Sequence, residues 1–166
     1  TFHDHLVKSS IVVVTGIERS TYRRYAIDAI SYDKIASDFW SAIQPMIYDM
    51  GYDGDYAMHF YDDTKRLVFI LAPNRPQPAP ALDIARFINA KLQHHYESTF
   101  LGAGTSILNF TVFSENLSPL EELPQVFMDL CQLHSLNFFC PQLRVMNASI
   151  RDSSKVNCTQ SVMLQY

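Results

Sequence analysis

Two apolar runs on either side of a short polar turn constrain the fold of this chain more than any other feature. The runs Tyr56–Tyr61 and Arg66–Ala72 are rich in aromatic and aliphatic residues, which is typical of strands, and the letters between them are Asp-Asp-Thr-Lys. A connection this short joins neighbouring antiparallel strands, so we expect a β-hairpin. The adjacent Asp62 and Asp63 are then either a carboxylate site or only the tip of the hairpin.

Hydrophobic periodicity predicts the elements of the first half of the chain. A continuous, mostly β-branched run at Ile11–Ile17 predicts a buried strand. Apolar residues at every fourth position from Ile35 to Ile47 predict a helix that ends near Gly51 and is kinked or split at Pro45. The proline-dense residues 73–80 predict an extended loop.

The second half predicts two helices and two strands. Residues 81–96 show helical spacing, with Leu82 among the positions expected on the apolar face. Residues 100–113 predict a strand, although Asn109 interrupts its apolar run. Ser118 is expected to cap a helix whose first position is Pro119, and a short strand is expected within residues 143–150.

The order of these elements predicts the fold class. Strand, helix, strand, strand, helix, strand, helix, strand favours an α+β fold: a mostly antiparallel, ferredoxin-like sheet with a βαββαβ core and helices packed on one face. Residues 11–150 are expected to form one domain, with a linker at 1–10 and a linker or tail at 151–166. A chain of 166 residues is long enough for one such core.

Composition excludes several classes of protein. A formal net charge of −4 gives no electrostatic footprint for nucleic acid. Three cysteines without CxxC spacing indicate neither a disulfide framework nor a zinc site. Since we find no signal peptide and no apolar stretch of membrane-spanning length, we expect a cytoplasmic protein without membrane contact, unless a targeting segment lies outside this sequence.

Two stretches resemble a known family. "GYDGDYAMHFYDDTKRLVFILAP" (51–73) is similar to the signature region of GGDEF domains, which have the nucleotide-cyclase-like fold. "LEELPQVFMDLCQLHSLNFFCPQLRVMNASI" (120–150) is similar to the end of the degenerate GGDEF-like middle domain of AraC-type (YesN-like) bacterial response regulators. The resemblance covers most of residues 11–150 and implies the nucleotide-cyclase-like sheet.

The chain departs from the family pattern where a cyclase does its chemistry. The turn lacks the glycine pair, and Lys65 and Arg66 lie near the positions where the family has acidic side chains. At the end of the first strand, where the family has another metal-binding aspartate, this chain has Thr15, with Glu18 as the only nearby acid. Because a two-metal phosphoryl-transfer site needs its carboxylates, we expect no enzymatic activity and no cofactor.

The resemblance then implies a regulatory function. We expect a signal-relay domain that links a receiver or sensor to a DNA-binding domain, with another domain contacting DNA and with homodimers formed through this or neighbouring domains. A second hypothesis is a small-molecule or nucleotide sensor that uses the former cyclase cleft, with Asp62, Asp63, Lys65 and Glu18 as ligand-binding residues. A divergent nucleotide cyclase is the third.

Other polar groups are interpreted structurally. The aspartates at 53, 55, 62 and 63 match no calcium-binding loop and are typical of turns, so we expect no metal site. His94 and His95 are adjacent on a helix, point about 100° apart, and are expected to be solvated. Cys131 is expected to be a small buried side chain rather than a nucleophile.

Overall fold

The elements follow one another in the predicted order, with one additional short strand. The computed structural model describes residues 9–17, 29–53, 59–60, 66–99, 109–135 and 145–147. They form β1 (Ile11–Ile17), α3 (Ala29–Asp49), β2 (Tyr52–Asp53), β3 (His59–Phe60), β4 (Leu67–Pro73), α4 (Ala81–Thr99), β5 (Asn109–Phe113), the 3-10 helix η3 (Leu120–Glu122), α5 (Leu123–Ser135) and β6 (Val145–Asn147). The fold is therefore α+β, as predicted.

These strands form a single mixed sheet. Its order is β2-β4-β1-β5-β6, and β3 also pairs with β4. The predicted hairpin is confirmed by the antiparallel pairing of β3 with β4, in which His59 lies opposite Phe69. β1 pairs antiparallel with both β4 and β5, and only β5 and β6 are parallel among the described strands. The crossover through α3 leads from β1 to β3, with β4 between them in the sheet. The crossover through α4 leads from β4 to β5, with β1 between them.

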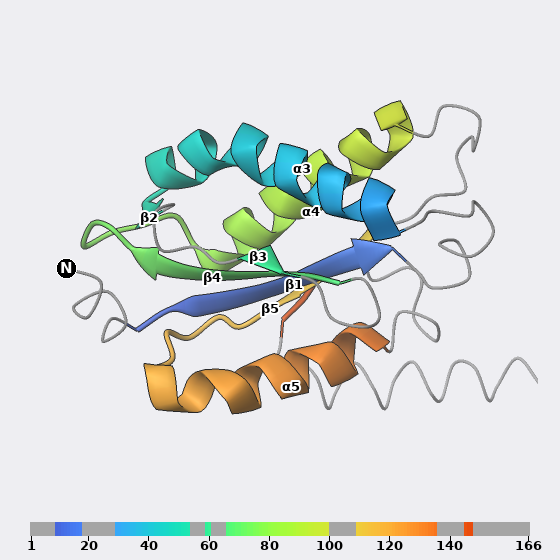
Figure 1. Cartoon of the computed structure of the whole chain (residues 1–166). Helices are drawn as coiled ribbons and strands as arrows, with labels where there is room; N and C mark the ends of the chain where they lie inside the picture. The colour runs from blue at the N-terminus through green and yellow to red at the C-terminus, as the bar shows by residue number, and fades with distance from the viewer. Residues whose placement is uncertain are drawn as a thin grey trace, which may run out of the picture.

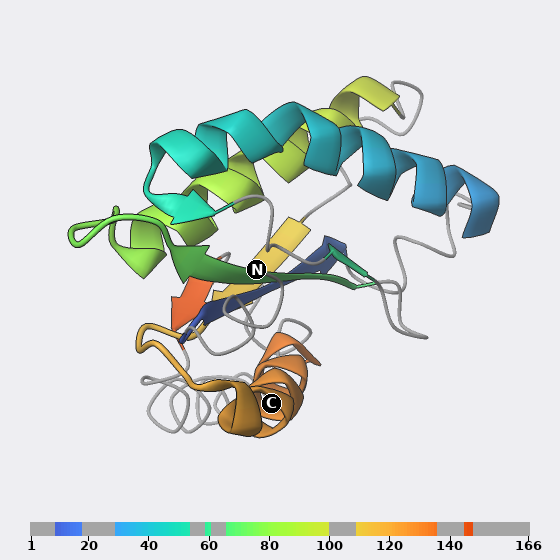
Figure 2. The same cartoon turned by 60° about the vertical axis from the view of Figure 1, so that its left-hand side comes forward.

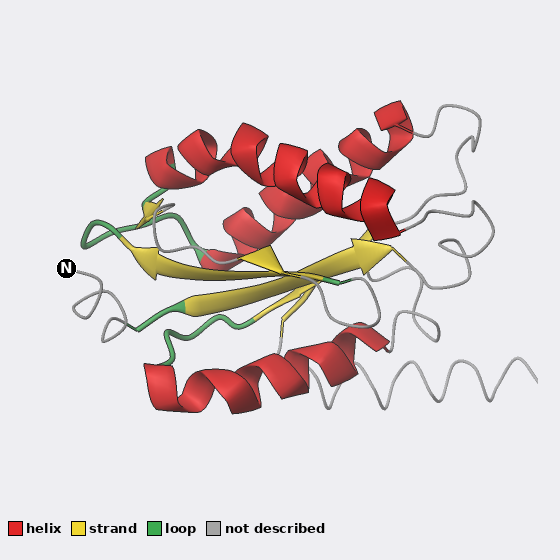
Figure 3. Ribbon diagram, in the orientation of Figure 1, coloured by secondary structure: helices red, strands yellow, loops and turns green. Residues whose placement is uncertain are grey.

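Helices cover both faces of the sheet, so the prediction of helices on one face is wrong. Figure 1 shows α3 and α4 above the sheet and α5 below it, and Figure 2 shows the same three layers from another side. The ribbon coloured by secondary structure makes the helix, sheet, helix layering plain (Figure 3).

The alternation of side chains along the strands accounts for two separate cores. On β1, Ile11 and Val13 join the cluster under α3 and α4, whereas Val12 and Val14 join the cluster over α5. Successive strand residues point to opposite faces, so a strand that is apolar at every position must be covered on both sides. β1 is such a strand, and its residues 11–14 are at most 1% exposed.

α3 ends where the sequence predicts but is not divided at Pro45. The helix continues through Pro45 to Asp49. Gly51 then adopts a φ of 105°, a conformation that L-residues with side chains rarely adopt. A Cβ at Gly51 would also lie 2.6 Å from the Cα of Pro78, so the glycine lets the proline-rich loop pack closely against the end of α3.

The apolar face of α4 differs slightly from the prediction. Leu82, expected on that face, is 37% exposed. The fully buried positions are Ile84, Ala85, Ile88, Leu92 and Tyr96. Ala85, Ile88 and Leu92 are positions that the helical spacing predicts, and only Leu82 is wrong. No helix in the described part of the chain is long and apolar enough to cross a lipid bilayer.

Candidate functional site

The residues predicted to line the former cyclase cleft lie outside the described residues. Glu18 comes directly after β1 in the chain, and Asp62, Asp63 and Lys65 lie between β3 and β4. Their predicted role in ligand binding therefore stays a prediction.

The described strands that flank these residues in the sequence meet at one end of the sheet, where β1 ends and β4 and β5 begin. Thr15 of β1 lies opposite Leu67, the first residue of β4. Ile17, the last residue of β1, lies opposite Asn109, the first residue of β5. We call this region, from Thr15 to Ile17 with the first residues of β4 and β5, the hairpin end of the sheet.

A buried polar network lies at the hairpin end, on the face covered by α4. It consists of Thr15, Asn89, Asn109 and Thr111. The Nδ2 of Asn109 donates hydrogen bonds to Thr15 Oγ1 (2.9 Å) and Asn89 Oδ1 (3.0 Å). Thr111 Oγ1 donates to the same Asn89 oxygen at 2.8 Å and lies 2.8 Å from Thr15 Oγ1. The four side chains therefore close a ring of hydrogen bonds between two strands and a helix.

The two threonine hydroxyls have alternative acceptors. Each hydroxyl carries one proton: Thr15 Oγ1 lies within hydrogen-bond distance of the Phe110 carbonyl oxygen (3.2 Å) and of Thr111 Oγ1, and Thr111 Oγ1 lies within hydrogen-bond distance of Asn89 Oδ1 and of Thr15 Oγ1. With the Asn89 amide kept as it stands, rotating the Asn109 amide by 180° would place its oxygen against the oxygen of Asn89, which disfavours that single rotation.

One acceptor of the network has no partner. Asn109 is fully buried, with 0% of its surface exposed. Within the described residues, its Oδ1 atom accepts no hydrogen bond. The backbone N–H of Asn109 is satisfied, because it donates to Gln93 Oε1 of α4 at 2.7 Å. An unpaired buried oxygen costs on the order of 1–3 kcal/mol, and such an atom commonly binds water, an ion or a ligand.

The opposite face of the hairpin end carries a second set of polar contacts, which are only partly buried. Arg66 donates from Nε to His134 Nδ1 (3.2 Å) and from Nη2 to Ser135 Oγ (2.7 Å). His134 Nε2 lies 3.1 Å from the carbonyl oxygen of Phe110. Since Nδ1 accepts and the carbonyl cannot donate, His134 is the neutral tautomer with its proton on Nε2. These contacts attach the end of α5 to the start of β4 and β5.

The buried network at the hairpin end can exchange hydrogen bonds but carries no charge. It consists of hydroxyl and amide groups, which are uncharged at neutral pH. No group of three or more His, Cys, Asp or Glu side chains that could hold a metal ion occurs in the described ranges of the chain.

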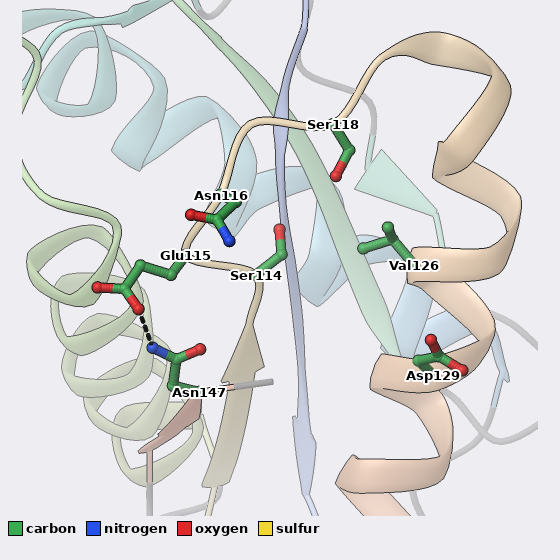
Figure 4. Close-up of a pocket in the computed structure, with 7 residues that line it drawn as sticks. All are labelled: Ser114, Glu115, Asn116, Ser118, Val126, Asp129 and Asn147. Carbon is green, nitrogen blue, oxygen red and sulfur yellow. Dashed lines mark hydrogen bonds between the residues drawn. The ribbon is translucent and has the colours of Figure 1, made fainter. Parts of the chain in front are cut away.

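A pocket lies at the other end of the sheet, between the segment after β5 and helix α5 (Figure 4). Its volume is about 270 Å³. Glu115 Oε2 accepts a 2.7 Å hydrogen bond from Asn147 Nδ2, which joins the ends of β5 and β6. The lining residues are Ser114, Glu115, Asn116, Ser118, Val126, Asp129 and Asn147.

Ser118 lines this pocket and does not cap a helix, so the predicted N-cap is wrong. The chain first forms η3, whose N-cap is Pro119 and which has no side-chain capping hydrogen bond. The backbone of Ser118 instead forms an antiparallel bridge with Ser10. This bridge fixes residue 118 in an extended conformation and turns its hydroxyl toward the pocket (Figure 4).

His95 is less exposed than the sequence suggests. It lies 6.0 Å from the ring of Phe39 and is half-buried between α4 and α3, whereas His94 is exposed. Loss of hydration lowers the pKa of His95 below its ordinary value of 6.5, the nearby Asp38 opposes the shift, and His94 adds to it. The prediction of two solvated histidines therefore holds only for His94. Cys131 is only partly buried and packs beside the cluster over α5.

No family model matches the chain, and no curated protein is significantly similar to it.

Proposed function

We propose that this chain is a non-catalytic regulatory domain, the GGDEF-like middle domain of a bacterial AraC-type transcriptional regulator. It relays a signal from a receiver or sensor to a DNA-binding domain of the same protein. DNA is contacted by that other domain, and this domain contributes to self-association.

The observation that carries the proposal is the environment of Thr15. The resemblance to GGDEF domains places a metal-binding aspartate at the end of the first strand. Thr15 at this position is 0% exposed, and its hydroxyl bonds to Asn109 and Thr111. A side chain occupied in a neutral, buried network supports the loss of metal-dependent chemistry at this position, because Mg²⁺ is held mainly by carboxylates and phosphates.

The sheet order supports the cyclase-like part of the proposal. β4 lies between β1 and β3, and β1 lies between β4 and β5. Both helical crossovers therefore skip one strand, which is the split βαβ arrangement of ferredoxin-like folds. The nucleotide-cyclase-like fold that we propose builds on this core.

The complete reading frame tests the regulatory assignment. We expect a receiver-like domain before Thr1 and two helix-turn-helix units after Tyr166. In the full-length protein, deletion of those units should abolish DNA binding while the rest of the chain still self-associates in sedimentation experiments. Neighbouring domains of any other class would contradict the proposal.

One observation favours the alternative, a sensor of small molecules or nucleotides. The unpaired, buried Asn109 Oδ1 lies at the hairpin end, next to the strand ends that would border the former cleft. Calorimetry with GTP and with cyclic di-GMP, each with and without Mg²⁺, tests it. Heat of binding that the wild type shows and Asn109→Ala lacks would support the sensor hypothesis. The absence of binding heat with every one of these ligands would rule out a sensor of GTP or cyclic di-GMP.

A further inference from the structure

We propose that the surface formed by the segment after β5 and by η3 is a docking site for a basic amphipathic helix of a partner protein. We call it the docking surface, and its members are two exposed leucines and three exposed glutamates: Glu115, Leu117, Leu120, Glu121 and Glu122. It follows the end of β5 that lies opposite Asn109, so the inference does not depend on the function proposed above.

A bulge after β5 holds part of the docking surface out of the sheet. The backbone N–H of Ser114 donates to the carbonyl oxygen of Val12 at 3.0 Å, and Ser118 exchanges two backbone hydrogen bonds with Ser10. Between these two pairings, β1 has one residue and the facing segment, 115–117, has three. The surplus residues bulge outward, and all three of the segment are exposed. Figure 4 shows the chain leaving β5 at Ser114 and returning at Ser118.

The two leucines of the docking surface are apolar side chains held in solvent. Leu117 is 49% exposed, and Leu120, in η3, is 46% exposed. Three positions separate them in the chain, so their Cα atoms lie within about 11 Å of each other. Ser118, between them, is fixed by its bridge to Ser10. Little backbone freedom therefore remains to be lost when a partner covers the leucines, which favours binding.

The charge around the leucines favours a cationic partner. Residues 114–122 contain Glu115, Glu121 and Glu122 but no Lys, Arg or His. None of the three glutamates forms an ion pair with a described residue, and Glu115 accepts only from the neutral amide of Asn147, which leaves its charge in place. Lys or Arg side chains of a partner gain charge-assisted hydrogen bonds here, whereas nucleic acid or an anionic lipid surface is repelled.

The combination of apolar and acidic groups fits an amphipathic helix with basic borders. Such a helix carries apolar side chains along one face, which can cover Leu117 and Leu120, and charged side chains beside that face. Glutamates precede the first leucine and follow the second, so basic residues on both borders of the helix find a carboxylate. The docking surface is small, and its charges are exposed, so we expect weak binding that salt weakens further.

Three peptides of equal length test the proposal on the full chain. The first is an amphipathic helix of leucine and lysine, the second has the same composition in scrambled order, and the third has glutamate in place of lysine. Fluorescence anisotropy gives the affinity, and backbone amide NMR locates the site. We expect the first peptide to bind and to shift the signals of residues 115–122, the scrambled peptide to bind at least about threefold more weakly, and the acidic peptide not to bind.

Variants of the docking surface separate the apolar from the charged contribution. Leu117→Ser and Leu120→Ser should each weaken binding of the amphipathic peptide about fivefold, because less apolar area is buried. The double variant Glu121→Gln with Glu122→Gln should weaken it by about fivefold and should reduce its dependence on salt. Thermal unfolding of each variant checks that the fold is kept.

Matched controls come from the helices on the other face of the sheet. Met46→Ser, on α3, removes an apolar side chain that is 45% exposed, which is close to the exposure of Leu120. The double variant Asp83→Asn with Glu97→Gln, at exposed positions on α4, makes the same change of net charge as the double glutamate variant. Both controls should leave the affinity within about twofold.

Four results would overturn the proposal. The first is that the amphipathic peptide does not bind. The second is that the controls weaken binding as much as the variants of the docking surface, which would mean that the peptide responds only to overall charge or stickiness. The third is that sedimentation shows self-association that is lost in Leu117→Ser or Leu120→Ser, which would make a second copy of the chain the occupant. The fourth is binding of the chain to vesicles of anionic lipid through this surface.

Discussion

Thr15 is a buried residue whose hydroxyl belongs to an uncharged hydrogen-bond network. Its side chain points to the face of β1 that also carries Ile11 and Val13, and there it meets polar groups instead of the apolar underside of α3. Asn109 and Thr111 supply those groups from β5, and Asn89 supplies one from α4. The network links two strands to a helix without any charged side chain.

The first residue-scale prediction concerns the hydroxyl of Thr111. Thr111→Val keeps the shape of the side chain but removes its hydrogen bonds to Thr15 and Asn89, so the free energy of unfolding should fall by about 1–3 kcal/mol. Since both hydroxyls belong to one network, the double variant with Thr15→Val should be less destabilised than the sum of the two single variants. Urea denaturation measures all three, and strictly additive losses would contradict the network.

The second residue-scale prediction concerns His95 and pH. The lowered pKa means that the unfolded chain takes up a proton at a higher pH than the folded chain does. Stability should therefore be complete above the ordinary pKa of 6.5 and should fall as the pH drops through that value toward the lower, folded pKa. The groups that modulate this effect are Asp38, which raises the pKa, and His94, which lowers it.

Urea denaturation at several pH values between about 5 and 7.5 checks this dependence. His95→Gln should reduce the slope of stability against pH in this range, and the neighbouring, exposed His94→Gln should keep most of it. Equal slopes for the wild type and His95→Gln would show that other groups carry the effect.

At the scale of elements, the sequence predicts the order of the helices and strands better than the side of the sheet that each helix covers. The hairpin and the end of α3 near Gly51 follow from turn residues and periodicity, and the structure has both. Periodicity indicates which face of a helix is buried but not which side of the sheet covers that face, so the prediction of helices on one face of the sheet is wrong for α5. The signal was present in β1, because a strand that is apolar at every position needs cover on both faces.

The polar residues inside apolar patterns were visible in the sequence, but their pairing was not. Asn109 interrupts the apolar run of β5, and Asn89 lies beside Ile88 at the edge of the apolar stripe of α4. Their contact joins residues that are 20 positions apart through packing of a helix on a sheet. The pattern at Ser118 predicts an N-cap that the structure lacks, because local capping rules do not include its bridge to Ser10, which is distant in sequence.

The element-scale prediction concerns how α5 is held on its face of the sheet. Arg66→Met removes the hydrogen bonds from the start of β4 to His134 and Ser135, so stability should fall by about 1–2 kcal/mol and amide exchange in the last turn of α5 should accelerate. Arg86→Met, an exposed position on α4, is the matched control and should change stability by less than about 0.5 kcal/mol. Equal effects of the two variants would contradict a role for Arg66 in attaching the helix.

At the scale of the whole molecule, the two ends of the sheet differ in chemistry. The hairpin end is bordered by buried hydroxyl and amide groups, and the other end opens into a pocket with two carboxylates.

Turnover of GTP by the full-length protein tests the central claim most directly. Purified protein is incubated with GTP and Mg²⁺, and the nucleotides are separated by chromatography. We predict that GTP stays intact and that no cyclic dinucleotide forms, because the end of β1 offers the buried hydroxyl of Thr15 where a cyclase has a metal-binding carboxylate. Formation of cyclic di-GMP or another cyclic nucleotide in proportion to the amount of protein would contradict a non-catalytic regulatory domain.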